Sequence, residues 1–145
     1  MTINKNAGTS NLLNLVSFGG FKDGSTVTVH TSTILNDPLG EMVLQRDPDR
    51  LDTLGTILAL QNESLQGFSG QKLISAQKVF INNSAAAQFI EVDSSDPTNI
   101  TYSAQTTIVQ ASSIAFVNLF TSRLPQPAAQ TEQIYSSMLK SFQFK

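Results

Sequence analysis

The stretch SIAFVNLFTSR, residues 113–123, decides the fold class of this chain. Its apolar side chains alternate between the two sides of an extended chain, with Ile114, Phe116 and Phe120 on one side and Ala115, Val117 and Leu119 on the other. A strand that is apolar on both sides is typical of the centre of a sheet whose two faces are both covered. We therefore expect a central strand here, with other elements packed on each side of it.

Five runs that precede this stretch also have the composition of strands, because Val, Ile, Thr and aromatic residues are frequent in them and turn residues bound them. The expected strands cover residues 25–34, 41–46, 72–81, 85–93 and 100–110. Between the first two lies NDPLG, residues 36–40, which we interpret as a turn with Pro38 at its second position. Short connections between successive strands favour antiparallel pairing.

Two amphipathic helices complete the pattern. We expect the first over about residues 49–66, with Asp47 or Asp49 as its N-cap and with Gly67 and Gly70 marking its end. The second lies within residues 129–144, where Ile134, Met138 and Phe142 recur at a spacing of four residues. The sequence therefore predicts an α+β fold, an antiparallel sheet of about six strands with two main helices packed against it.

Length and composition limit the possible classes of protein. The 145 residues suit one domain. Residues 1–11 are polar and patternless, so we expect a flexible N-terminal arm followed by one domain over residues 12–145. The net charge is −2, without the basic surplus that nucleic-acid binding needs. The sequence has no Cys, no signal-peptide pattern and no apolar run of about 18 residues, so we expect a soluble cytoplasmic protein without a membrane span.

No catalytic motif is present in the sequence. His30 is the only histidine and lies in a Thr- and Ser-rich strand without a recognisable nucleophile or carboxylate partner. The acidic residues Asp47, Asp49 and Asp52 stand where a helix begins, which capping and the helix dipole explain without a metal. We therefore expect a protein that is not an enzyme and that needs no cofactor and no metal ion.

Four stretches resemble the PsbP/DcrB-like superfamily, and among its members the chain is most similar to the Eag-type adaptor chaperones of bacterial type VI secretion. These stretches are GGFKDGSTVTV (residues 19–29), MVLQRDP (42–48), LGTILALQNESLQGF (54–68) and MLKSFQF (138–144). The resemblance covers about residues 18–144. It implies a homodimer with a hydrophobic groove, which binds the N-terminal transmembrane helices of an effector protein and assists their loading onto the spike protein.

The resemblance also implies which residues face the client. It places Val27 and Val29 of the first strand and Met42 of the second in the groove, with Gln61 and Gln105 as polar contacts. The residues by themselves leave two alternatives open. The aliphatic side chains can equally be ordinary core residues, and the two amides can equally face solvent.

Other functions fit the same fold. A DcrB-like envelope protein or a PsbP-like accessory protein is one alternative, and a relative that binds a Ran-type GTPase is another if the source is eukaryotic. An enzyme that uses His30 is the third.

Overall fold

The computed structural model describes residues 2–7, 14–66, 70–82 and 84–144, and it confirms the expected α+β class. A seven-stranded antiparallel sheet has the order β1-β2-β3-β7-β6-β5-β4. Its strands are β1 (Thr2–Ala7), β2 (Asn14–Gly19), β3 (Thr26–Thr33), β4 (Gln71–Ile81), β5 (Ser84–Asp93), β6 (Thr101–Gln110) and β7 (Ser113–Ser122). Four of the six predicted strands recur as β4 to β7 with small shifts at their ends, and a fifth recurs as β3.

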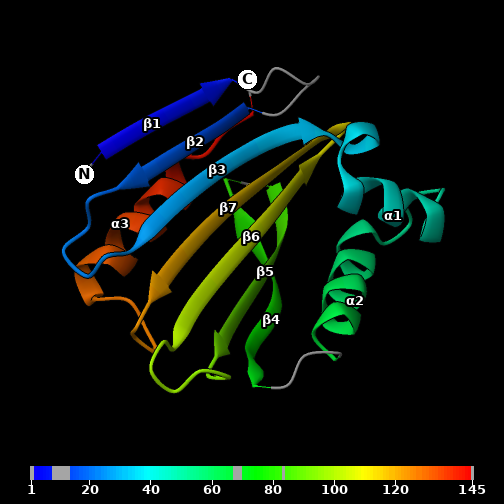
Figure 1. Cartoon of the computed structure of the whole chain (residues 1–145). Helices are drawn as coiled ribbons and strands as arrows, with labels where there is room; N and C mark the ends of the chain where they lie inside the picture. The colour runs from blue at the N-terminus through cyan, green and yellow to red at the C-terminus, as the bar shows by residue number, and fades with distance from the viewer. Residues whose placement is uncertain (1, 8–13, 67–69, 83, 145) are drawn as a thin grey trace.

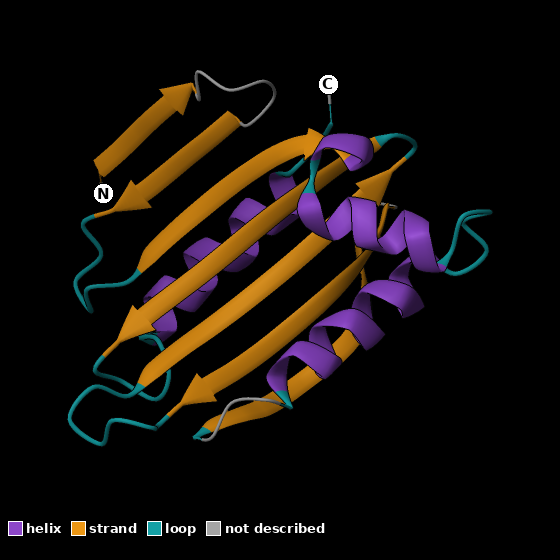
Figure 2. Ribbon diagram, turned by 45° about the vertical axis from the view of Figure 1, so that its right-hand side comes forward, coloured by secondary structure: helices purple, strands orange, loops and turns teal. Residues whose placement is uncertain are grey.

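Helices cover both faces of the sheet, but unequally (Figures 1 and 2). Helix α3 (Ala129–Ser141) packs on one face. Helices α1 (Pro38–Arg46) and α2 (Thr53–Leu65) lie on the other face, where α2 runs over β4 and β5. A short 3-10 helix, η1 (Ile34–Asn36), joins β3 to α1. No helix within the described ranges is long and apolar enough to cross a membrane.

Strand β7 is central and buried, as its sequence predicts. It pairs with β3 on one side and β6 on the other. Val117 and Leu119 join the core cluster beneath α3. Ile114 and Phe116 point to the opposite face and pack with Ile34 of η1 and with residues of α1. The covering of both sides explains why this strand is apolar at nearly every position.

The core beneath α3 contains a buried tyrosine that is fully hydrogen-bonded. The Tyr135 hydroxyl lies 2.9 Å from the Val117 carbonyl oxygen, to which it donates, and 3.0 Å from Thr106 Oγ1. Burial raises the pKa of Tyr135 to about 12. Because the folded-state pKa exceeds the unfolded value near 10, the associated stabilisation is present below about pH 10 and is lost as the pH rises through the folded value.

The expected strand over residues 41–46 is wrong, because this segment is helix α1. The Asp37 side chain accepts hydrogen bonds from the backbone N–H groups of Leu39 (2.9 Å) and Gly40 (3.1 Å), which makes it an N-cap. Pro38 is then the first helical residue, where its missing N–H costs nothing. The Asp-Pro pair that we interpreted as part of a turn therefore starts a helix.

The N-cap predicted for the following helix, α2, is also wrong. Its N-cap is Asp52, which accepts from the Gly55 N–H at 3.1 Å, and neither Asp47 nor Asp49 takes that role. Asp47 instead accepts from two backbone N–H groups in the connection between α1 and α2. The expected end signal at Gly67 lies outside the described residues.

The polar N-terminus contains secondary structure that the sequence pattern does not predict. Residues 2–7, expected within a flexible arm, form β1 and pair with β2 from Thr2 opposite Gly19 to Ala7 opposite Asn14. Residues 8–11 of the expected arm lie outside the described residues. Strand β2 in turn pairs with β3, so the sheet extends two strands beyond the predicted edge.

We predict that Tyr135→Phe lowers the free energy of unfolding by about 1 to 2 kcal/mol, because the buried Val117 carbonyl and Thr106 hydroxyl each lose a partner. Urea titration followed by circular dichroism measures this change. The matched control is Tyr102→Phe, since Tyr102 packs against the same core cluster and its hydroxyl makes no hydrogen bond within the described residues. An equal loss in both variants would contradict the role of the Tyr135 hydroxyl.

We predict that Gly40→Ala destabilises the protein by about 1 to 3 kcal/mol, although alanine is usually the better helix former. A Cβ atom at this position would collide with the backbone carbonyl of Ile34, which η1 holds in place. Thermal and urea unfolding measure the effect. Ala59→Gly, at an exposed position of α2, gives the ordinary helix-propensity cost for comparison. A Gly40→Ala variant that is more stable than the wild type would show that η1 can move enough to make room for the Cβ atom.

Candidate binding face of the sheet

The face of the sheet that carries α1 and α2 is only partly covered (Figure 1). A row of directly opposed residues crosses its uncovered part from β2 to β6, namely Ser17, Thr28, Asn118 and Gln105. The next row consists of Thr26, Phe120 and Ser103. We call these seven residues the open face. None of them is charged, and Phe120 is 45% exposed in spite of its size.

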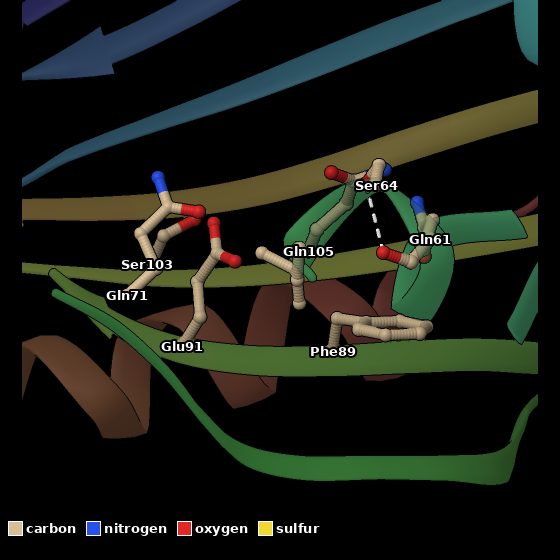
Figure 3. A pocket seen from close by; sticks show the side chains of 8 residues that line it. Gln61, Ser64, Gln71, Phe89, Glu91, Ser103 and Gln105 are labelled. Carbon is tan, nitrogen blue, oxygen red and sulfur yellow. Dashed lines mark hydrogen bonds between the residues drawn. The ribbon is translucent and has the colours of Figure 1, made fainter. Parts of the chain in front are cut away.

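A cavity of about 240 Å³ adjoins the open face beneath α2 (Figure 3). Helix α2 and strands β4, β5 and β6 line it with Gln61, Ser64, Leu65, Gln71, Phe89, Glu91, Ser103 and Gln105. Ser103 and Gln105 belong to both the open face and the cavity, so the two form one continuous surface. The Ser64 hydroxyl donates to the Gln61 carbonyl oxygen at 2.8 Å and is thereby held on the helix.

Buried polar atoms without a partner gather on this side of the sheet. Within the described residues these atoms are His30 Nε2, Gln61 Oε1, Gln71 Oε1 and Asn118 Oδ1. Two of them line the cavity, and the other two belong to the neighbouring strands β3 and β7. A buried polar atom that lacks a hydrogen bond costs about 1 to 3 kcal/mol. Buried polar groups without partners are uncommon in folded proteins, so their concentration on one face calls for an explanation.

Among the described residues that line the cavity, Glu91 is the charged one, and it was not predicted from the sequence. It lies directly opposite Ser103, and its carboxylate points into the space between Gln71 and Gln105 (Figure 3). Burial raises the pKa of Glu91, and the negative charge of Asp93 raises it further. Strand periodicity could have found this residue, since Glu91 and Phe89 are two positions apart and therefore share a face.

The structure brings together only two of the five residues that the resemblance implies for client binding. Gln61 on α2 and Gln105 on β6 both line the cavity. Val27 is fully buried beneath α3 on the opposite face, and Val29 packs against the same cluster. These two valines are core residues, which is the alternative that the sequence left open.

Met42 lies in a different place from the other four residues. It is on helix α1 and not on a strand, as the corrected fold requires, and it is 49% exposed. Together with Gln45, Arg46 and Leu60 it lines a separate open hollow of about 250 Å³. A contribution of Met42 to the same groove as Gln61 and Gln105 therefore has no geometric support.

His30 has the surroundings of a packed aromatic residue. Its ring stacks on Phe116 with 5.4 Å between the ring centroids. Among the residues that the structure describes, no serine, threonine or carboxylate hydrogen-bonds to its ring, and no three His, Asp or Glu side chains gather closely enough to hold a metal ion. Asp47 and Asp52 near the start of α2 accept hydrogen bonds from backbone N–H groups, and Asp52 also pairs with Lys78 at 3.1 Å.

Comparison with known proteins supports the fold. No protein-family model and no curated protein sequence matches this chain. Among solved structures it is similar to PA94 from Pseudomonas aeruginosa, a protein of unknown function described as a candidate regulator. The TM-score is 0.61 at 13% sequence identity, and the match covers 99% of this chain and 97% of that one. At this identity the similarity establishes the shared fold alone.

We predict that Gln61→Leu raises the free energy of unfolding by about 1 kcal/mol, because it replaces a buried, unpaired amide oxygen with an apolar group of similar size. Urea titration measures the change. The control is Gln133→Leu on the exposed side of α3, for which we expect a change within about 0.5 kcal/mol. Destabilisation by Gln61→Leu would show that water or another group pairs with the amide in the free protein.

Proposed function

We propose that this chain is a non-enzymatic adaptor chaperone that holds an apolar α-helix of a client protein against the open face. The observation that carries the proposal is the continuous surface formed by the uncharged open face and the adjoining cavity, with unpaired amide oxygens on Gln61 and Asn118. Through the resemblance to Eag-type adaptors, the client would be a type VI secretion effector with N-terminal transmembrane helices. A homodimer, a spike protein as second partner and a cytoplasmic location belong to the same proposal.

The dimensions of the open face suit one helix. It extends from β2 across β3 and β7 to β6, which is three strand spacings or roughly 14 Å. An α-helix with its side chains is about 10 to 12 Å wide. Helix α2 rises beside this surface and would form one wall of the binding site (Figure 2).

The chemistry of the surface suits a helix that is apolar and rich in small residues. Phe120 offers exposed apolar contact, and the seven residues of the open face bring no charge that the client would have to desolvate. The oxygens of Gln61 and Asn118 can accept hydrogen bonds from Ser or Thr hydroxyls, or from the free N–H groups of the first helical turn. Small side chains on the client would let these amides approach its backbone.

The test uses a soluble carrier protein fused to a segment of about 20 Leu, Ala and Gly residues, co-expressed with this chain. We expect the chain to keep the carrier soluble and to be recovered with it in a pull-down. Phe120→Glu should reduce the recovered carrier at least about tenfold, because a charge would then face the apolar helix.

Phe80→Glu is the matched control, since Phe80 is 79% exposed and lies on β4 outside the open face. It should leave recovery unchanged. Recovery that is equally low in both variants would point to general loss of solubility. Recovery that Phe120→Glu does not affect would overturn the open face as the binding site.

A further inference from the structure

The cavity beneath α2 has the polarity of a site for a cation. Among the described residues that line it, Glu91 is the charged side chain and none is Lys or Arg. The two ion pairs found among the described residues join Arg46 to Glu63 and Lys78 to Asp52, so neither neutralises Glu91. A half-buried carboxylate without a cationic neighbour is an unfavourable arrangement unless a partner supplies the charge.

The neutral groups around Glu91 are turned so that oxygen atoms face the cavity. The Gln71 amide donates through Nε2 to Asp93 Oδ2 at 3.5 Å, which leaves its buried Oε1 unpaired. Gln61 contributes a second buried oxygen without a partner from the opposite wall. Ligands with several N–H donors would satisfy these acceptors and the carboxylate together.

We propose that this cavity binds the guanidinium group of an arginine that flanks the apolar helix of the client. The inference rests on the proposed function, and it adds a subsite that selects the client and fixes the direction in which its helix lies. Ser103 connects this subsite to the open face, because it lies opposite Phe120 on one side and Glu91 on the other.

A guanidinium group fits this cavity better than a calcium ion does. Its five N–H groups and weak hydration suit a half-buried site with acceptors on several sides. A cavity of about 240 Å³ is smaller than the roughly 300 to 1,000 Å³ typical of small-molecule pockets, and so it suits a single side chain. Calcium sites normally have more than one carboxylate, whereas Glu91 is the one carboxylate among the described residues that line this cavity.

Two further observations agree with this assignment. Burial and the charge of Asp93 raise the pKa of Glu91, a shift that a bound cation would reverse. Apolar helices that span membranes commonly carry Lys or Arg just beyond one end. A helix held on the open face with that end towards α2 would present such a residue to the cavity.

The first arm of the test is independent of helix binding. N-acetyl-arginine amide is titrated into the protein, and the side-chain amide signals of Gln61 and Gln71 are followed by NMR. We expect saturable shifts in the wild type, at least about tenfold weaker binding in Glu91→Gln, and no shifts with uncharged N-acetyl-citrulline amide. Glu132→Gln, which removes the same charge from an exposed position of α3, should bind as the wild type does.

Absence of shifts in the wild type, or equal binding by Glu91→Gln, would overturn the cation site. Binding of N-acetyl-lysine amide as tight as that of the arginine compound would overturn the choice of guanidinium.

The second arm uses the carrier with its apolar segment, followed either by Arg or by Gln. We expect about three- to tenfold more recovery of the Arg form by the wild type, and equal recovery of both forms by Glu91→Gln. Equal recovery by the wild type would overturn the role of the cavity in selecting clients. If neither form is recovered although the NMR titration shows binding, the adaptor function is overturned. The guanidinium site is still supported in that case.

Discussion

Strand β7 is buried from both sides over only part of its length, and the rest of the structure depends on this asymmetry. Its first half lies between α3 on one face and η1 with α1 on the other. Further along, Val117 and Leu119 are still buried beneath α3, whereas Phe120 on the opposite side is 45% exposed. The core therefore ends where the open face begins, and the same strand that organises the fold also supplies the candidate binding surface.

Much of the sheet could be predicted because burial imposes a period of two on strand sequences. Helix α1 could not be predicted in this way, since Asp37 and Pro38 suit both a turn and a helix start, and the helix that begins at Pro38 has only nine residues. The β1 strand was missed for another reason. Its stretch, residues 2–7, is polar, so no apolar alternation marks it, and pairing with β2 is a tertiary contact.

The candidate site could be predicted only in part. The resemblance supplied Gln61 and Gln105, and strand periodicity could have added Glu91. Gln71 was beyond such reasoning, because a bulge between Leu73 and Ser75 shifts the register of β4 against β5 and breaks the alternation of faces. The cavity also depends on how α2 docks, which Asp52 and the packing of Ile57 and Leu60 determine.

The two faces of the sheet differ in whether their buried polar groups are hydrogen-bonded. Beneath α3, the Tyr135 hydroxyl has two close partners, and the Ser25 and Thr121 hydroxyls lie 2.7 Å apart. On the other face, four buried polar atoms lack partners within the described residues. Each such atom costs about 1 to 3 kcal/mol, while whole domains are stable by only about 5 to 15 kcal/mol.

A face that served only to close the core would gain stability from apolar residues at these positions. The amides of Gln61, Gln71 and Asn118 have the shape to be replaced by leucine or a similar side chain, and the core beneath α3 shows that this fold can satisfy its buried polar groups. Polar groups that weaken the free protein make physical sense when a bound partner completes their hydrogen bonds, since binding then recovers the free energy that folding gives up. This difference between the faces, more than the shape of the cavity, is what favours a binding role for the side that carries α2.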